Sequence, residues 1–484
     1  MAQERLQPGQ AGGPDEYELA AALAAVQVFA DEVEAQADGC QATAAGSWAA
    51  AAVLEGVAGG ALRLCRPLPA GARRHPWLAP ALAFLPSWLI IAALLFSAGM
   101  PVLAQGQAAA ERERAGTLAV RVCLTTTPKG ITVDLPQGAD LKDALSGRLL
   151  KHLPAASKII LPGQERRSLL LEPAYPAGLF ELNGKLYRGR LLVRRSQASP
   201  SAVNAINIVD LEEYLLSVVP SEMPSGWPLE ALKAQAIAAR SYAVSRLGTY
   251  EAEGFDLKAT TEDQVYAGVQ AESPATSQAV AETAGIVLKH EGKVVPAFFH
   301  STSGGYTRAP EPLSGRYYPF LKAVPDYDDR SPYFTWSQNL AVPVIEEALR
   351  GCGRGVGSLL GVYVIARAQG FRAGHVLVVG SEGIRLLTGE EMRRILKLPS
   401  TNFNVGCAEE AYVIAGRGFG HGMGLSQWGA RALAENGYNA AQILAYYYKD
   451  VSLDYLEDKA SQIGQDSRAQ APLTGAEPGP AKPI

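Results

Sequence analysis

The spacing of apolar and polar residues changes several times along the chain, and each change predicts a different kind of element. From 117 to about 206, apolar and polar positions alternate and β-branched residues are frequent, which is typical of strands. Asn183-Gly184 separates two such runs at 180–189, and this dipeptide is a strong signal for a two-residue hairpin turn. We therefore expect a β-rich region here.

A helix is predicted after Pro228. Proline suits the first helical position, and Glu230 falls in the first turn, where the helix dipole favours an acid. Apolar residues then recur at three- and four-residue steps and predict one buried face: Leu229, Leu232, Ala236, Ala239 and Ala243. Lys233 and Arg240 lie two turns apart on one side, so we expect a short cationic stripe. Glu222, just before this helix, is interpreted as part of a loop.

Further along, helical and strand patterns alternate. Residues 274–284 predict a helix ending at Gly285, and 286–299 predict a hairpin that leads to His300. A smaller helix and strand region is expected at 342–407, and two helices at about 425–448, the last with a capping box of Asn439 and Gln442. The expected fold class is α+β: a mixed, mostly antiparallel sheet with helices packed around a substrate groove.

The two ends of the chain differ from this region. Residues 1–72 are Ala-rich and acidic, and we expect a helical or disordered extension; residues 461–484 are rich in Gln, Pro, Ala and Gly, and we expect a disordered tail. The functional region is therefore placed at 117–454, with a β-rich part at 117–206 and an α+β core at 207–454.

Residues 73–104 predict export. The uncharged, mostly apolar run at 77–103 is long enough to cross a bilayer, and Arg73 and Arg74 precede it, which places the following chain outside the cytoplasm. Residues 102–104 resemble a signal-peptidase site. One interpretation is an uncleaved membrane anchor, and the other is a cleaved secretory signal whose true start lies downstream of Met1. Both export the rest of the chain to the periplasm or cell wall.

Composition narrows the class of function. The chain has 48% hydrophobic and 19% charged residues and a net charge of -4, which argues against nucleic acid as a partner. The five cysteines are scattered singly without a CxxC pair, so neither a zinc knot nor a disulfide framework is expected, although Cys352 and Cys407 could pair.

Glu222 is the first candidate for chemistry. Val219, Met223 and Trp227 could desolvate its carboxyl and raise its pKa, as a general acid requires. The following helix N-terminus and a cation such as Lys233 would lower that pKa. The sequence does not decide which of these effects on the pKa of Glu222 is larger.

Two other stretches carry polar groups. His300 with Ser301 and Ser303 lacks an orienting acid, so contact with substrate or loop hydrogen bonding is favoured over a nucleophilic triad. The Gly-rich run at 416–430 matches neither GxGxxG nor GxSxG, but its glycines permit close backbone approach to a ligand. The side chains that such a loop could present to a sugar are Arg417, His421, Gln427 and Trp428.

Three blocks of this sequence resemble the stage II sporulation protein D/LytB (SpoIID/LytB) family of bacterial cell-wall proteins. They are 211–243 with Ser221-Glu222-Met223-Pro224, 297–305 with His300, and 418–430. The resemblance covers about 118–454. It implies lytic transglycosylase action on peptidoglycan glycan strands, especially strands stripped of stem peptides by an amidase.

The resemblance also implies roles for residues. The catalytic glutamate falls on Glu222, the matching basic positions on Lys233 and Arg240, and the matching histidine on His300. Some members bind zinc through cysteines shortly after that histidine, but Tyr306-Thr307-Arg308 stands here, so no zinc and no other cofactor are expected. A zinc hydrolase using His300 and His421 is the alternative that metal analysis would detect.

One carboxyl suffices for this reaction. Hydrolytic glycosidases generally use two carboxylates, whereas a lytic transglycosylase uses the 6-hydroxyl of N-acetylmuramic acid as an internal nucleophile. A hydrolytic mechanism would have to recruit a second acid such as Asp263, Asp326 or Asp328. Other family members are amidase enhancers, so a glycan-binding partner of a cell-wall amidase remains the second hypothesis.

Overall fold

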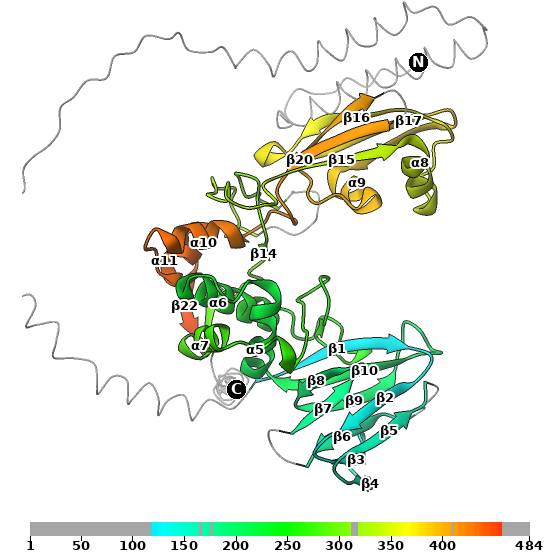
Figure 1. Ribbon diagram of the computed structural model, residues 1–484, viewed down its shortest axis with the longest axis vertical. Helices are drawn as coiled ribbons and strands as arrows, with labels where there is room; N and C mark the ends of the chain where they lie inside the picture. Colours follow the sequence, from blue (N-terminus) through cyan, green and yellow to red (C-terminus); the bar gives the residue numbers. More distant parts are fainter. Residues whose placement is uncertain (1–117, 164–166, 175–177, 311–317, 409–410, 457–484) are drawn as a thin grey trace, which may run out of the picture. The chain divides into compact units, whose positions relative to one another are not determined.

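The computed structural model describes residues 118–456, apart from 164–166, 175–177, 311–317 and 409–410 (Figure 1). Its sheets are mostly antiparallel and its helices pack beside them, which confirms the predicted α+β class. The predicted extension at 1–72, export segment at 73–104 and tail at 461–484 lie outside the described residues. Within the described part, none of the helices combines the length and the apolar character needed to cross a membrane.

The first part of the described chain consists of strands. They are β1 (Ala119–Thr127), β2 (Ile131–Leu135), β3 (Ala139–Asp143), β4 (Leu149–Leu153), β5 (Ser157–Leu161), β6 (Leu169–Pro173), β7 (Leu179–Leu182), β8 (Lys185–Arg188), β9 (Arg190–Arg195) and β10 (Val203–Asp210). Seven strands form one sheet in the order β11-β1-β10-β9-β6-β3-β4, where β11 is Leu257–Lys258, and β5-β2-β7-β8 form another. One buried cluster draws on both sheets, with Val120 from the first and Val133 and Phe180 from the second.

The predicted hairpin is confirmed. β7 and β8 pair antiparallel across Asn183 and Gly184, whose φ angles are 54° and 76°. Positive φ at both central residues is the geometry that an Asn-Gly turn favours.

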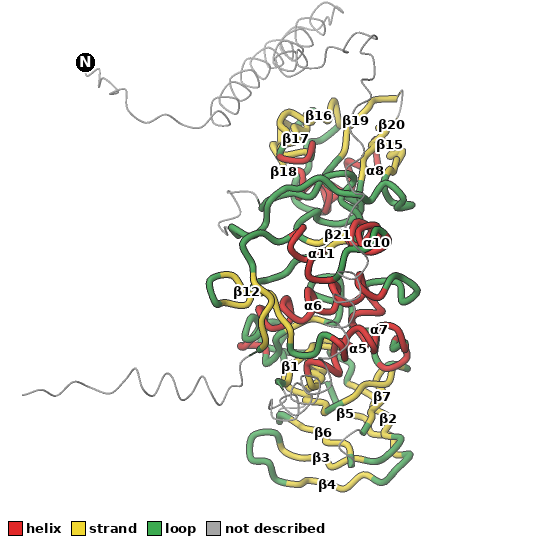
Figure 2. Tube along the Cα trace, turned by 90° about the vertical axis from the view of Figure 1, so that its left-hand side faces the viewer, coloured by secondary structure: helices red, strands yellow, loops and turns green. Residues whose placement is uncertain are grey.

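Five helices from two separate stretches of the sequence pack together (Figure 2). They are α5 (Leu211–Glu222), α6 (Leu229–Ser245), α7 (Pro274–Glu282), α10 (Gln427–Glu435) and α11 (Ala440–Tyr447). Helix α6 contacts the other four and also strand β12 (Ile286–His290). It is therefore buried on nearly all sides, and the single buried face predicted from the sequence is too narrow: Ala231, Ala234, Gln235, Ile237 and Ala238 are buried as well.

Glu222 is the last residue of α5, so its assignment to a loop is wrong. The helix begins after Asp210, whose side chain accepts hydrogen bonds from the backbone N–H groups of Glu212 and Glu213, and it continues through Pro220. It ends because Met223 precedes Pro224, and a residue before proline is disfavoured in the helical region. Met223 is accordingly extended, with φ -131° and ψ 134°.

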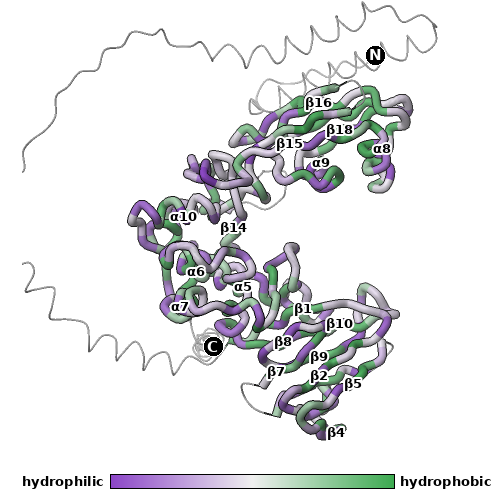
Figure 3. Tube along the Cα trace, viewed as in Figure 1, coloured by the Kyte–Doolittle hydropathy of each residue, from purple (hydrophilic) through white to green (hydrophobic). Residues whose placement is uncertain are grey.

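Residues 335–417 form a small unit with its own core. Its elements are β15 (Thr335–Ala341), α8 (Val342–Gly351), β16 (Leu359–Arg367), η4 (Gln369–Phe371), β17 (Ala373–Gly380), β18 (Gly383–Thr388), α9 (Gly389–Leu396), β19 (Phe403–Ala408) and β20 (Ala411–Arg417). They make two three-stranded sheets, β15-β20-β19 and β16-β17-β18. Ile345, Val376 and Met392 belong to the shared apolar cluster, and Figure 3 shows hydrophobic residues along β16 and on α8.

Short strands complete the fold. They are β13 (Lys293–Val294), β14 (Phe299–His300), β21 (Leu425–Ser426) and β22 (Ser452–Tyr455), with the short 3-10 helices η1 (Glu251–Glu253) and η2 (Val269–Ala271). β12 pairs with β13 and β22, and β14 pairs with β21 in parallel. Cys352 and Cys407, which could have formed a disulfide, are free thiols, as is Cys123.

A comparison of two helical glycines tests the packing of α10. A Cβ added at Gly429 would lie closer than 3.0 Å to Asp326 Oδ1 and to the Tyr447 hydroxyl, whereas a Cβ at Gly351 in α8 would meet nothing within 4 Å. Gly429→Ala should therefore lower the free energy of unfolding by about 2 kcal/mol or more through overpacking. Gly351→Ala should leave it unchanged or raise it by up to about 1 kcal/mol, measured by urea denaturation. Equal stability of the two variants would contradict the packing described.

Candidate active site

Three segments that are far apart in the sequence converge beside α6. The Trp227 ring, just after Glu222, meets the Trp428 ring with centroids 4.9 Å apart. The backbone N–H of Trp428 donates to the carbonyl of Ser301 at 3.1 Å. Strand pairing then sets His300 opposite Ser426. The segments that carry Glu222, His300 and the Gly-rich run thus form one continuous contact network.

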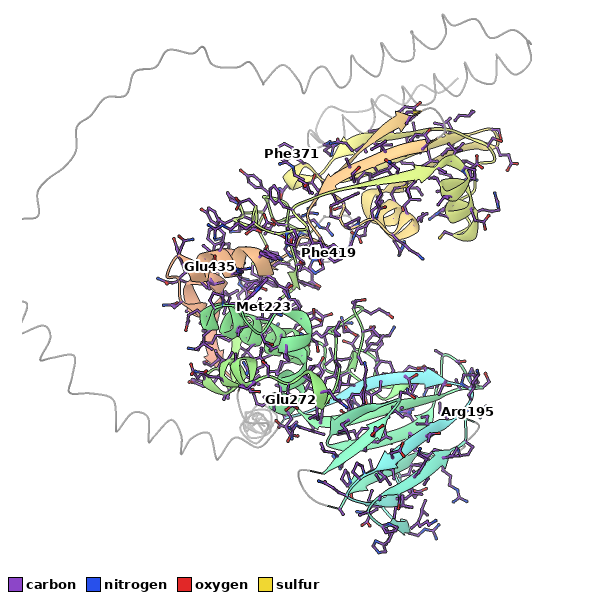
Figure 4. The ribbon with its side chains drawn as sticks, viewed as in Figure 1. Arg195, Met223, Glu272, Phe371, Phe419 and Glu435 are labelled. Carbon is purple, nitrogen blue, oxygen red and sulfur yellow. The ribbon has the colours of Figure 1, made fainter. Side chains whose placement is uncertain are left out.

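The carboxyl of Glu222 is half-buried and accepts one strong hydrogen bond. The backbone N–H of Val265 donates to Glu222 Oε1 at 2.6 Å. Burial raises the pKa of Glu222 above its ordinary value of 4.5, and the Val265 hydrogen bond opposes this rise without cancelling it. The opposing influence was expected from Lys233 and the helix N-terminus; the structure places it instead on a main-chain donor. Figure 4 labels Met223, the residue that follows Glu222 in the chain.

Two side chains hold the segment that supplies the Val265 N–H. Asp263 accepts from the backbone of Lys258 at 3.0 Å, from the Tyr242 hydroxyl at 3.0 Å and from Arg246 Nε at 3.2 Å. Gln264 accepts from the Tyr214 hydroxyl and donates to the Ala239 carbonyl, both at 3.2 Å. The donor is therefore fixed to both α5 and α6. Nothing in the sequence pointed to Val265 or Gln264, since a main-chain donor has no side-chain signature.

The two basic residues of α6 do not form a free cationic stripe. Lys233 Nζ lies 2.9 Å from Glu230 and 2.6 Å from Glu282. Arg240 has no exposed surface; its guanidinium binds Glu212 through two hydrogen bonds of 2.7 and 2.6 Å and also donates to the carbonyl of Ile286. Both cations are already neutralised by carboxylates.

The two histidines lie together and are uncharged. Their ring centroids are 5.4 Å apart. His300 Nδ1 donates to the Met423 carbonyl at 3.1 Å, and His421 Nδ1 accepts from the Met423 N–H at 3.0 Å. Burial lowers the pKa of His300 well below 6.5 and that of His421 to about 3. His300 Nε2 is buried without a hydrogen-bond partner among the described residues.

The residues after His300 form a turn that a buried aspartate holds. Asp328 accepts from the Ser303 hydroxyl at 3.1 Å and from the N–H groups of Gly304 and Gly305 at 2.8 and 3.0 Å. Asp326 accepts from the Tyr447 hydroxyl at 2.7 Å, and burial together with the nearby Asp328 charge raises its pKa to about 6. Asp263, Asp326 and Asp328, considered above as second acids, therefore all have internal structural partners.

The Gly-rich run is a close-packed loop rather than an open one. Gly420, Gly422 and Gly424 all have positive φ, and a Cβ at Gly422 would lie within 3.0 Å of the buried Arg372 guanidinium. Gln427 is buried and its amide reaches Gln235 at 3.4 Å. Trp428 is half-buried and Arg417 is exposed.

Direct substrate contact remains a prediction for every residue named from the sequence. The observed bonds give Arg240, Ser303 and Gln427 structural roles, since each is buried and bonded to protein groups. Trp428 and Arg417 keep accessible surface. The sequence did not single out Arg431, whose guanidinium lies 5.4 Å from the Trp227 ring centroid and 5.0 Å from that of Trp428.

The described residues do not fit a zinc site. Zinc needs three or four protein ligands. His300 and His421 are neighbours, but the described part of the chain has no group of three His, Cys, Asp or Glu side chains placed to hold a metal. The expectation of no cofactor stays a prediction.

Comparison with known proteins identifies the family. A family model described as Stage II sporulation protein matches residues 199–290, which include Glu222, Lys233 and Arg240. The chain is 32% identical over 266 residues to the Stage II sporulation protein D of Bacillus amyloliquefaciens, covering 52% of this chain and 76% of that protein. It belongs to the SpoIID/LytB family. This confirms the resemblance found in the sequence.

Further relatives of this SpoIID/LytB chain carry different names. An uncharacterized protein of Brachyspira hyodysenteriae is 31% identical over 281 residues, covering 57% of this chain and 74% of that protein. The Amidase enhancer of Bacillus subtilis is 30% identical over 290 residues, covering 49% of this chain and 40% of that protein. A second family model, a domain of unknown function (DUF8618), matches 315–424, which include the small unit and most of the Gly-rich run.

Removing Arg240 should destabilise the protein far more than removing Lys233. Arg240→Met leaves Glu212 without its buried partner, and breaking such a pair costs about 3 kcal/mol or more. Lys233→Met removes two partly exposed ion pairs, with Glu230 and Glu282, each worth about 1 kcal/mol or less. Urea denaturation followed by tryptophan fluorescence measures both, and a loss below about 1 kcal/mol for Arg240→Met would refute the role given to it.

The raised pKa of Glu222 predicts a pH-dependent effect of Glu222→Gln on stability. Because the folded pKa lies above the unfolded one, ionised Glu222 opposes folding once the pH exceeds 4.5, and this penalty is absent below it. The variant should therefore unfold at a higher temperature than the parent at pH 8, and the difference should vanish near pH 4. Thermal unfolding across this range measures it. A parent that is more stable than the variant at pH 8 would show that the carboxylate is not desolvated.

Proposed function

We propose that this chain is an exported lytic transglycosylase that cleaves the MurNAc–GlcNAc bond of peptidoglycan glycan strands. The observation that carries the proposal is Glu222: a half-buried carboxyl with a raised pKa, held by one backbone donor from Val265. Its pKa shift has only two causes, burial and the Val265 N–H, and neither is a charged neighbour. That environment suits a single general acid. The family relatives supply the cell-wall context, and export through residues 73–104 is part of the proposal.

In the proposed mechanism Glu222 moves one proton in each direction. Protonated Glu222 gives its proton to the glycosidic oxygen as the bond from that oxygen to muramic acid C1 breaks. The carboxylate then takes the proton from the 6-hydroxyl of the same muramic acid, as O6 forms a bond to C1. The products are a 1,6-anhydro-muramic acid end and a new GlcNAc 4-hydroxyl, so no water is consumed and no second carboxyl is needed.

The aromatic pair of Trp227 and Trp428 fits a sugar-binding role. Trp227 and Trp428 are both half-buried, and Arg431 lies over both rings. Such rings present an apolar face with polar groups at the edge, as a pyranose requires. In the proposed function this pair positions the glycan, while the neutral His300 and His421 keep the adjoining loop in place.

Activity on amidase-treated peptidoglycan tests the acid directly. Glu222→Gln should lower the rate of glycan cleavage about 10²- to 10⁴-fold, the usual contribution of a general acid. Glu213→Gln is the matched control, because Glu213 lies on the same helix and burial also raises its pKa. The control should retain activity within a few-fold. Full activity of Glu222→Gln would remove Glu222 as the catalyst.

The relative named Amidase enhancer favours a second candidate function. In that case the chain would bind glycan and stimulate an N-acetylmuramoyl-L-alanine amidase without cleaving strands itself. Absence of cleavage by the parent protein, together with glycan binding and faster amidase turnover, would support this function over the first.

A further inference from the structure

A cavity of about 460 Å³ opens where the turn after His300 meets the 335–417 unit. Its lining consists of three glycines and six larger residues: Tyr306, Arg367, Phe371, Asn402, Asn404 and Arg417. None of these nine residues is acidic. Most of them lie within 315–424, the segment that matches a domain of unknown function.

The cavity offers two guanidinium groups that carry no carboxylate partner among the described residues. Arg367 is fixed in place: it donates to the carbonyl oxygens of Phe371 and Phe403 at 2.7 and 3.2 Å and to Asn404 Oδ1. Arg417 is exposed, and its guanidinium lies 5.7 Å from the ring centroid of Phe334. Two arginines without a carboxylate partner at one cavity favour an anionic ligand, and a planar guanidinium matches the geometry of a carboxylate or a phosphate.

Two solvent-exposed aromatic side chains line the same cavity as these arginines. Phe371 is 71% exposed and Tyr306 45% exposed, with ring centroids 6.5 Å apart. Phe371 has a φ of +63°, which is unfavourable for a bulky residue, and the hydrogen bond from Arg367 to its carbonyl secures this conformation. Figure 4 labels Phe371 in the turn between β16 and β17. The fold thus holds the Phe371 ring at the surface, next to Tyr306 and at the rim of the cavity.

The combination specifies the chemistry of the ligand. The aromatic rings suit the apolar face of a sugar, the amides of Asn402 and Asn404 suit hydroxyl or acetamido groups, and the arginines suit a carboxylate. Within the proposed substrate, the group with all of these features is N-acetylmuramic acid whose lactyl group has lost its stem peptide. In an intact strand that carboxyl is tied up as an amide and carries no charge.

We propose that this cavity is a glycan subsite that recognises the free lactyl carboxylate of denuded strands and so distinguishes them from strands with stem peptides. The inference rests on the proposed function for its substrate class. It concerns binding, however, and can be measured without cleavage.

Binding to the full chain carrying Glu222→Gln provides the test. The probes are denuded glycan oligomers, the same oligomers with the lactyl carboxyls converted to methylamides, and neutral N-acetylglucosamine oligomers. Arg417→Ala should weaken binding of the denuded oligomers about tenfold or more, as the loss of a charge-assisted hydrogen bond requires. It should leave binding of the two neutral probes unchanged. Calorimetry gives the Kd values.

Two further variants separate recognition from folding. Phe371→Gly keeps the positive φ, which glycine tolerates, and removes only the ring. It should therefore weaken the binding of all three probes. Arg394 is an exposed arginine of α9 outside the cavity lining, and Arg394→Ala should leave the affinity for all three probes unchanged. Each variant should keep the unfolding temperature of the parent.

The outcomes are distinct from those of the proposed function. Unchanged affinity of Arg417→Ala for denuded oligomers, or an equal loss for the neutral probes, would overturn the inference even if the enzyme cleaves glycan. Competition by free stem peptide as strong as by denuded glycan would reassign the cavity to a peptide carboxylate and also overturn it. Arginine-dependent binding with no cleavage by the parent would uphold the subsite and reject the transglycosylase.

Discussion

Arg240 lies in the middle of α6 with no exposed surface, and its guanidinium forms an ion pair with Glu212 in the first turn of α5. The same two residues reach the carbonyl of Ile286 and the N–H of Gly285, so the ion pair also holds the start of β12. An arginine buried this deeply is stable only when each charge and most donors are satisfied. The pair therefore fixes how α5 crosses α6, and with it the position that the end of α5 takes relative to α6.

That end point determines the character of Glu222. Because Met223 precedes Pro224, the helix stops with the acid as its last residue, facing the segment that carries Val265. Asp263 and Gln264 hold that segment against both helices, and the position of the Val265 N–H is therefore fixed relative to Glu222. A single neutral donor lowers the pKa less than burial raises it. The carboxyl is thereby able to keep a proton at a pH where an exposed glutamate has lost it, which is the property that glycosidic oxygen protonation needs.

Much of the fold was predictable because it depends on local signals. Asn183-Gly184 specifies its hairpin through backbone angles alone, and the helix after Pro228 follows from proline, an acidic first turn and regular apolar spacing. The SpoIID/LytB motifs were likewise visible in sequence order. Helix α5 was not predicted and Glu222 was assigned to a loop, although Asp210 followed by Glu212 and Glu213 is a recognisable helix start.

The site could be predicted less well, for a physical reason. Whether Lys233 and Arg240 face a substrate or a protein carboxylate depends on which elements pack against α6, and the sequence of α6 contains nothing about Glu212 or Glu282. The hydrogen bond that tunes Glu222 comes from the main chain of Val265, which any residue could supply. Long-range packing decides both questions, and a single sequence records it only indirectly.

The central claim is that one carboxyl transfers protons while the sugar supplies its own nucleophile. Digestion of denuded glycan strands in water enriched in ¹⁸O, with mass spectrometry of the new ends, tests it most directly. The account predicts 1,6-anhydro-muramic acid ends that contain no ¹⁸O, because no water oxygen enters the product. Reducing muramic acid ends that carry ¹⁸O from the first turnover onward would contradict it and would require a second catalytic acid.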